Sequence, residues 1–190
     1  PEHGPEAQRY QAVLLAVPAP QAAPLLEAVA PKAATLARSA PMRACWSVMV
    51  RCPQPVALPV DGCFIEHSPL RWIARDSSKP GRSGPETWLL HASHAWSEAH
   101  VHDAATAVTA ALLQAFAQLG GPDPASVQAT AHRWLYADSA PPLHVDGWWQ
   151  PDAGLGLCGD WLHNGTVEGA WLSGRHLAQR VHATLAAHTA

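Results

Sequence analysis

The chain has 190 residues, a formal net charge of −3 and 48% hydrophobic residues, which is typical of a globular protein with an ordinary core. The weak negative charge argues against a nucleic-acid-binding surface, and no apolar run approaches the ~20 residues of a membrane-spanning helix. Nine tryptophans indicate either a large aromatic core or a flat aromatic ligand.

The four cysteines show no C-x-x-C spacing and lie in apolar or strand-like stretches. This is not the pattern of a disulfide-rich secreted domain. We therefore predict buried, reduced thiols and a cytoplasmic location.

The first predicted strand covers residues 10–17, a largely apolar run that ends at Pro18. Such a run suits a strand of a parallel sheet that is buried on both faces. Residues 21–38 carry an Ala/Leu-rich helical pattern that Pro24 and Pro31 interrupt, which predicts two short helices.

The middle of the chain is dominated by short predicted strands, which favour an antiparallel sheet. They are expected at residues 42–52, 62–66, 70–75, 87–92 and 127–136. A helix is expected from an Asp103 cap to about Leu119, with an apolar face at helical spacing. The segment from there to Pro151, rich in proline and tryptophan after residue 136, is predicted to be loop apart from the strand at 127–136.

The C-terminal segment is predicted to be a strand at residues 155–158 followed by a helix at 167–187. Small residues at the helix start leave its backbone N–H groups accessible to an anion or a polarised carbonyl oxygen. Asp160, at the strand end, suits a sugar or ribityl hydroxyl. This stretch predicts half of a cofactor site. The apolar stripe expected to face the sheet is Ala170, Gly174, Leu177, Val181 and Leu185.

Together these elements predict an α+β fold with a discontinuous organisation. Residues 1–20 and 154–190 are interpreted as pieces of one domain, and residues 21–153 as a second domain with an antiparallel sheet and helices. The two outer pieces contribute a strand and the C-terminal helix.

Residues 154–159 match the letters G-x-G-x-x-G, but we do not interpret them as a dinucleotide-binding motif. In that motif the first glycine follows a strand and the last opens a helix. Here the apolar residues lie inside the motif and no helix opens after it, so a turn before a strand is the better interpretation.

The histidines allow a metal-binding hypothesis, with the tightest spacing among His91, His94, His100 and His102. Zinc needs three or four converging ligands. No cysteine pair or H-E-x-x-H motif accompanies these histidines, so we predict no metal site.

Three residues are candidates for contact with a substrate or a flat ligand. Lys79 stands out because the chain has few lysines and because a Ser-, Pro- and Gly-containing loop holds it. Trp134 and Tyr136 share one face of a predicted strand and could either form the wall of a ligand site or belong to the core. Ser173, inside the last helix, is interpreted as a packing contact.

Five blocks in fixed order carry a resemblance to a known family. They are Val17-Pro18-Ala19-Pro20-Gln21; Trp72-Ile73-Ala74-Arg75 with Ser78-Lys79-Pro80; Thr87-Trp88-Leu89-Leu90-His91-Ala92-Ser93 with Trp96-Ser97; His132-Arg133-Trp134-Leu135-Tyr136-Ala137; and Cys158-Gly159-Asp160-Trp161 with Val167-Glu168-Gly169-Ala170-Trp171-Leu172-Ser173-Gly174. The set resembles the bacterial renalase-like proteins, FAD-dependent oxidoreductases of the flavin-containing amine oxidase superfamily.

The resemblance implies a longer parent protein with an α/β FAD-binding fold, of which this chain is the C-terminal portion without the N-terminal βαβ unit. It implies that Gly159 and Asp160 contact the ribityl–pyrophosphate part of FAD. It also implies that Val167, Glu168, Gly169 and Ala170 bring backbone N–H groups against the flavin.

Larger amine oxidases place an aromatic residue shortly before the x-Glu-Gly-Ala segment, where this sequence has Asn164-Gly165-Thr166. The resemblance therefore implies hydride transfer to flavin from a small nicotinamide-like substrate in preference to an amine. The alternative is a non-catalytic module that binds a ligand or a partner without flavin. We expect the chain alone to be inactive and free of FAD, and to self-associate through the surface that a missing βαβ unit would cover.

Overall fold

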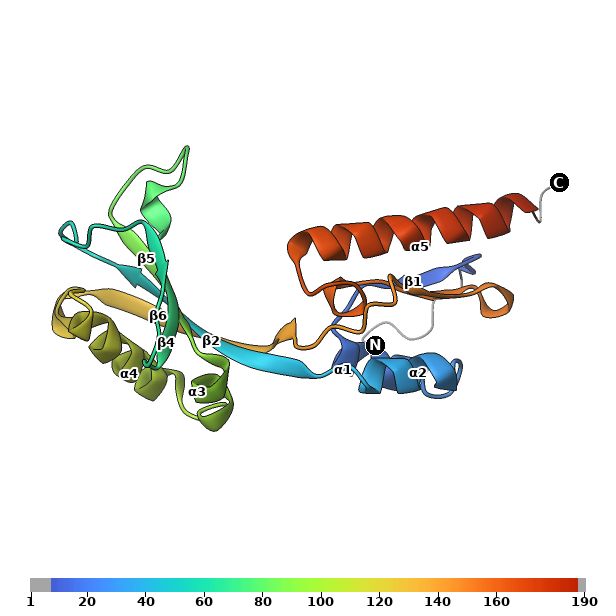
Figure 1. Cartoon of the computed structure of the whole chain (residues 1–190), viewed down its shortest axis with the longest axis horizontal. Coiled ribbons are helices and arrows are strands. Elements are labelled where there is room, and N and C mark those ends of the chain that lie inside the picture. Colours follow the sequence, from blue (N-terminus) through green and yellow to red (C-terminus); the bar gives the residue numbers. More distant parts are fainter. Residues whose placement is uncertain (1–7, 188–190) are drawn as a thin grey trace. The chain divides into compact units, whose positions relative to one another are not determined.

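The structure is a computed structural model that describes residues 8–187 (Figure 1). The described chain divides into two compact units. Unit 1 combines the residues up to Met42 with those from Asp138 onward, and unit 2 is Arg43–Ala137. Both units combine helices with a sheet, so the predicted α+β class is confirmed.

Unit 1 contains a three-stranded sheet in the order β1-β8-β7. The strands are β1 (Val13–Leu15), β8 (Leu155–Leu157) and β7 (Trp148–Gln150). β1 pairs with β8 in parallel, and β7 pairs with β8 antiparallel. The N-terminal and C-terminal parts of the chain thus contribute neighbouring strands to one sheet.

Helices cover both faces of this sheet (Figure 1). On one face, α1 (Ala19–Leu26) and α2 (Pro31–Arg38) bury their alanines against Leu157. On the other face, α5 (Val167–Ala187) packs Leu177 and Val181 against Trp149. Alternate residues of a strand point to opposite faces, and this alternation builds a helix–sheet–helix sandwich.

The buried face of α5 differs from the predicted stripe. Leu177 and Val181 are buried as expected, but the first two turns bury Gly169 and Ser173 instead of Ala170 and Gly174. Leu185 is exposed. The prediction was wrong at Ala170 and Gly174 because the helix turns its polar Ser173 inward to make a hydrogen bond, which an apolar pattern does not reveal. It was also wrong at Leu185, near the end of the helix.

Two strands of unit 1 differ from the prediction. The first strand is shorter than residues 10–17 and is not buried on both faces, because β1 is the edge of its sheet and Val13 is 47% exposed. β7 lies in the segment predicted to be loop. Its three residues pair with β8, with Trp149 opposite Gly156, so a long-range contact creates this strand.

Unit 2 is built on a five-stranded sheet in the order β3-β4-β5-β2-β6. The strands are β2 (Met42–Arg51), β3 (Gly62–Phe64), β4 (Leu70–Arg75), β5 (Thr87–Ala92) and β6 (Gln128–Ser139). The β2–β5, β4–β5 and β3–β4 pairs are antiparallel, as the short strands predicted.

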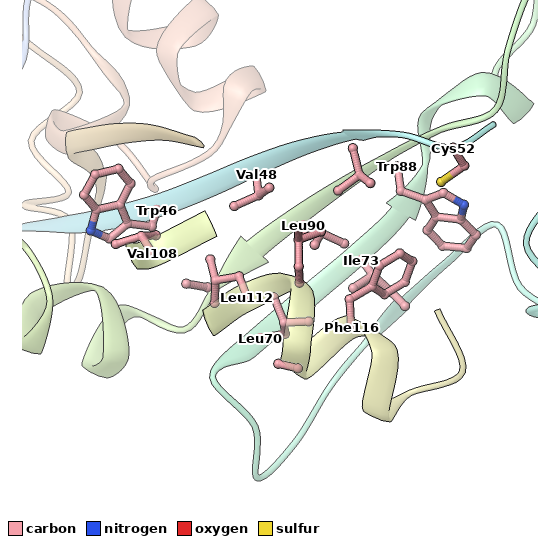
Figure 2. Close-up of a cluster of buried hydrophobic side chains, with 14 of the residues drawn as sticks. Trp46, Val48, Cys52, Leu70, Ile73, Trp88, Leu90, Val108, Leu112 and Phe116 are labelled. Carbon is pink, nitrogen blue, oxygen red and sulfur yellow. The ribbon is translucent and has the colours of Figure 1, made fainter. Parts of the chain in front are cut away.

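The core of unit 2 lies between this sheet and α4 (Ala105–Gln118). Figure 2 shows Leu112 and Phe116 of α4 directed at Leu90 and Ile73 of the sheet. The predicted apolar face of α4 is confirmed, but the predicted cap is wrong: the N-cap residue is Ala104. The Asp103 carboxylate instead accepts a hydrogen bond from His100 at the end of α3 (His94–Ala99).

A polar network closes one end of this core. Glu86 accepts hydrogen bonds from Arg75 and from the Trp88 indole, both at 2.6 Å. The Arg75 guanidinium also lies 4.7 Å from the centre of the Trp88 ring. Burial beside the Glu86 carboxylate raises the pKa of the Cys52 thiol, so Cys52 is a protonated core residue.

The compact units divide the chain at different residues from the predicted domains. The sequence predicted an inserted segment of residues 21–153, whereas unit 2 spans Arg43–Ala137. The difference arises because α1 and α2 pack with Leu157 and Trp161 of unit 1, and because β7 joins the sheet of unit 1.

The four cysteines all lie in the described part of the chain and form no disulfide there. Within residues 8–187, no helix is both long enough and apolar enough to cross a lipid bilayer.

Two glycines of unit 1 provide a matched test of this packing. A Cβ atom added at Gly156 would lie 2.9 Å from Leu177 Cδ1 and 2.8 Å from Leu14 Cδ2, whereas one added at Gly174 would meet nothing within 4 Å. We predict that Gly156→Ala lowers the free energy of unfolding by about 1–3 kcal/mol, because the core becomes overpacked.

The control, Gly174→Ala, is expected to raise the free energy of unfolding by about 0.5–1 kcal/mol, since alanine loses less backbone entropy in a helix. Urea unfolding followed by circular dichroism measures both values. A Gly156→Ala protein as stable as the parent would contradict the described contact between β8 and α5.

Candidate functional site

The carboxyl end of the parallel strands in unit 1 is where the predicted cofactor residues lie. β1 and β8 end side by side, and the Cys158 N–H donates to the Leu15 carbonyl at 3.1 Å. Gly159 follows, and Asp160 then opens a short 3₁₀ turn, η4 (Asp160–Leu162). In open sheets with parallel strands, ligands bind outside the carboxyl ends of the strands, so this edge is the natural place for a ligand.

Gly159 joins this strand end to α5. Its N–H donates to the Ser173 hydroxyl at 3.1 Å, and Ser173 is fully buried. Its φ is +156°, and a Cβ atom here would lie 2.8 Å from Nε1 of Trp161. Only glycine fits without displacing the Trp161 ring, which itself donates to the Val17 carbonyl.

The backbone of Asp160 is held by hydrogen bonds, while its side chain is available to a ligand. Its carbonyl accepts hydrogen bonds from the N–H groups of His163 and Gly165, both at 3.0 Å. Its carboxylate is half-buried, and no side-chain partner is recorded for it among residues 8–187. A carboxylate held in this way can accept hydrogen bonds from a hydroxyl-bearing ligand.

The N-terminus of α5 is capped but partly open. Thr166 is the capping residue: its Oγ1 accepts from the Gly169 N–H at 2.9 Å. Asn164 Oδ1 in turn accepts from the Thr166 hydroxyl at 2.7 Å and lies in the space that a Gly169 Cβ would need. Gly169 is therefore required for this close approach.

Two N–H groups remain at the helix start. Within the described chain, no hydrogen bond is recorded for the N–H groups of Val167 and Glu168, and the Val167 side chain is 91% exposed. The first N–H groups of a helix carry the positive end of its dipole. They suit an anion or a carbonyl oxygen that becomes negative during a reaction. Ala170, which is half-buried, adds only a methyl group beside them.

Cys158, next to this edge, is not a nucleophile in this environment. Burial raises the pKa of its thiol, which keeps the sulfur protonated near neutral pH. The polar chemistry at the carboxyl edge therefore comes from Asp160 and backbone N–H groups.

Trp134 and Tyr136 lie on the face of β6 that points away from the core of unit 2. Ala129 and Ala131 of the same strand pack against the core, so the alternate residues His132, Trp134 and Tyr136 lie outward. Trp134 is 54% exposed, and its ring lies 4.2 Å from that of His132. The core interpretation of these two aromatics is therefore wrong, and a solvent-facing aromatic surface remains.

Lys79 lies in the loop after η1 (Asp76–Ser78), and its ammonium group is 2.7 Å from Asp76. Asp76 also pairs with Arg82. Asp76 and Arg82, but not Lys79, line a cavity of about 560 Å³ on the outer side of the sheet. Met49, Thr87 and Thr130 also line it. The cavity has the size of a small-molecule site, and Lys79 lies next to its lining.

The histidines that have the tightest spacing in the sequence do not form a metal-binding cluster in the described chain. His94 is held through both ring nitrogens, by Arg71 at 2.6 Å and by the Ala44 carbonyl at 3.0 Å. His100 pairs with Asp103 and stacks on Trp96. Burial, with Arg71 and His94 nearby, lowers the pKa of His91 and keeps it neutral. The metal hypothesis for these residues finds no support in the described chain.

The sequence did not predict two features of unit 1, the role of Ser173 and a cluster of three polar side chains. Ser173, interpreted as a packing contact, is a hydrogen-bond acceptor for Gly159, and the signal was a small polar residue within an otherwise apolar face. Asp146, His163 and His176 lie together in unit 1. No local spacing indicates that group, because its members come from three separate segments.

Solved structures of similar fold are described as oxidases or oxidoreductases. A cyclohexylamine oxidase from Brevibacterium oxydans IH-35A is 15% identical, with a TM-score of 0.73 over 96% of this chain and 45% of that protein. An oxidoreductase from Methanosarcina mazei is 10% identical, with a TM-score of 0.64 over 90% of this chain and 43% of that one. Putrescine oxidase bound to putrescine is 15% identical, with a TM-score of 0.56 over 93% and 42% of the two chains.

At these identities the likeness concerns the fold, and the chain spans less than half of the length of each of these proteins. The sequence itself gives the more specific result. The sequence profile of the flavin containing amine oxidoreductases matches residues 2–182, which is nearly the whole chain. This chain belongs to the flavin containing amine oxidoreductase family.

Proposed function

We propose that this chain is the substrate-side and flavin-facing portion of a renalase-like, FAD-dependent oxidoreductase. The observation that carries the proposal is the carboxyl edge of β1 and β8, where the Asp160 carboxylate and the open N-terminus of α5 adjoin one another in sequence and share the Gly159–Ser173 link. Family membership supports the flavin, and the ordered sequence blocks support the renalase-like type.

The residues at this edge fit a flavin nucleotide. Asp160 would accept hydrogen bonds from hydroxyls of the ribityl chain, beside Gly159, whose backbone is fixed by the Ser173 hydroxyl and the Trp161 ring. The N–H groups of Val167 and Glu168 would face a ring carbonyl, and the small side chain of Ala170 would leave room for it. The N–H groups of Gly169 and Ala170 were also expected to face the flavin, but they donate to Thr166 instead. When bound, the flavin supplies hydride acceptance, and the positive end of α5 favours the negative charge that results.

The substrate that we propose is a small, flat molecule that donates a hydride, nicotinamide-like in preference to an amine. The segment Asn164-Gly165-Thr166 has no aromatic ring to form an amine cage. The outward Trp134 and Tyr136 offer rings on which a flat substrate could stack. Lys79 is the third residue that we propose on the substrate side, held by Asp76 until a ligand competes.

A non-catalytic module that binds an aromatic ligand without flavin is the alternative. The exposed aromatic face of β6 favours it, because that face exists whether or not a flavin is bound. The two hypotheses differ in one measurable property. An oxidoreductase needs Asp160 for flavin retention, whereas an aromatic-binding module needs only unit 2.

Asp160→Asn should weaken FAD binding by roughly 10–100-fold in the complete protein that contains this chain, because hydrogen bonds to a charged group contribute about 1.5–3 kcal/mol. Fluorescence titration of the flavin-free protein with FAD measures the dissociation constant. The chain of 190 residues by itself is expected to be purified without colour.

Asp152→Asn is the matched control, since Asp152 is an exposed aspartate close to Asp160 in the sequence, in the turn before β8. It should change FAD affinity by less than about twofold. Equal affinities for the Asp160→Asn and unmodified proteins would exclude the proposed role of Asp160 and favour the alternative.

We also propose that the chain by itself self-associates through β1. This edge strand leaves Val13 and Leu14 exposed by 47% and 44%, and the hydrogen-bonding groups on its outer side have no strand beside them in the described chain. An open apolar edge favours pairing with a second copy.

Val13→Lys should shift the chain towards the monomer, because a charge on an edge strand opposes strand pairing. Val29→Lys is the control, since Val29 is also exposed in unit 1 but belongs to no strand. Sedimentation velocity across a concentration series reports the oligomer. A wild-type chain that stays monomeric at submillimolar concentration would refute the proposal.

A further inference from the structure

Three potential metal ligands meet in unit 1, beside the segment that leads into α5. Asp146 precedes β7, His163 follows η4, and His176 lies on α5. One ligand atom from each residue lies within 4.8 Å of the other two, and His163 Nε2 lies 3.2 Å from Asp146 Oδ1. Two imidazoles and one carboxylate are a common ligand set for zinc and related ions.

The backbone holds two of these ligands in place. The N–H groups of Val145 and Asp146 both donate to the carbonyl of Leu162, at 2.7 Å and 3.1 Å. Leu162 is fully buried and directly precedes His163. Asp146 and His163 therefore share one anchored backbone junction, so their separation is set before any ion binds.

The third ligand, His176, is positioned by the core of unit 1. Its neighbour Leu177 is buried against β8, and the His163 and His176 ring centres are 6.1 Å apart. One turn later, Arg180 donates to the Gly147 carbonyl at 3.4 Å, which ties α5 to the loop that carries Asp146. The Arg180 charge opposes a cation nearby, and the Asp146 charge favours it.

His163 also shows an unsatisfied polar atom. Its Nδ1 is buried and has no hydrogen-bond partner in the described structure. His163 faces Asp146 through Nε2, so an ion bound at Nε2 would leave Nδ1 to carry the ring proton, and the case for the site rests on the spacing of the three ligand atoms.

We propose that Asp146, His163 and His176 bind one divalent transition-metal ion, of which Zn²⁺ is the best match. Tetrahedral coordination at ~2.0–2.2 Å places ligand atoms about 3.3–3.6 Å apart. The His163–Asp146 pair is already close to that spacing at 3.2 Å, and the widest separation, within 4.8 Å, must close by at most about 1.5 Å. The half-buried His176 can make that movement by rotating its side chain.

Bound metal would join the loop before β7 to the turn that precedes α5, within a single unit. The proposal does not depend on flavin or substrate, because all three ligands belong to unit 1 and the test uses the metal alone. Sequence spacing could not have found the site, since its ligands lie in a loop, a turn and a helix.

The test is isothermal titration of Zn²⁺ into the chain after dialysis against a chelator. We expect one tight site per chain, weakened at least about tenfold by His176→Ala and by Asp146→Asn. The control is His182→Ala, which removes an exposed histidine of the same helix and should leave the tight site within about twofold.

A second readout protects the test from a variant that fails to fold. Because Zn²⁺ binds only the folded site, it should raise the melting temperature of the wild type and of His182→Ala but not of Asp146→Asn, whose side chain is 62% exposed and tolerates substitution. The proposal is overturned if the wild type has no tight site, or if Asp146→Asn and His176→Ala bind Zn²⁺ as tightly as His182→Ala.

Discussion

The hydrogen bond from the Gly159 N–H to the buried Ser173 hydroxyl is the interaction on which the candidate cofactor edge depends. It fixes the end of β8 against the second turn of α5, across a segment that contains a 3₁₀ turn and a tight loop. Ser173 is fully buried, and a buried hydroxyl without a partner costs about 1–3 kcal/mol, so the strand end and the helix favour one arrangement. Asp160 and the start of α5 are placed as a consequence.

A second hydrogen bond connects the turn η4 to the segment that follows β1, the other parallel strand. The Trp161 indole donates to the Val17 carbonyl at 3.1 Å, and the ring occupies the space that a side chain on Gly159 would fill. The carboxyl ends of β1 and β8, the turn η4 and the helix start are thus linked through two side chains. These links fix the carboxyl edge although the parallel pairing covers only the residues from Val13 to Leu15.

Much of the fold and the family could be predicted from the sequence because their signals are local. The apolar residues of α4 recur at helical spacing, and the strands of unit 2 appear in the sequence as short runs between loop residues. β7 was missed because its pairing with β8 supplies the structure, while its own residues follow a proline-rich segment. The α5 face was misjudged because Ser173 is buried for a hydrogen bond.

The site residues divide in the same way. Gly159, Asp160 and the start of α5 could be named as candidates because strand, turn and helix follow one another along the chain, and their cofactor contacts stay a prediction. The group of Asp146, His163 and His176 could not, since backbone bonds between distant segments create it. The outward direction of Trp134 and Tyr136 became certain only when the packing of Ala129 and Ala131 defined the core side of β6.

We propose that the carboxyl edge of unit 1 faces a flavin. The most direct measurement is a ¹⁵N–¹H correlation spectrum of the labelled chain during titration with FAD, which detects weak binding even if the purified chain carries no flavin. We expect the largest shifts at the amides of Gly159, Asp160 and residues 167–170. A titration that leaves those amides unchanged, or that moves only amides of unit 2, would contradict it.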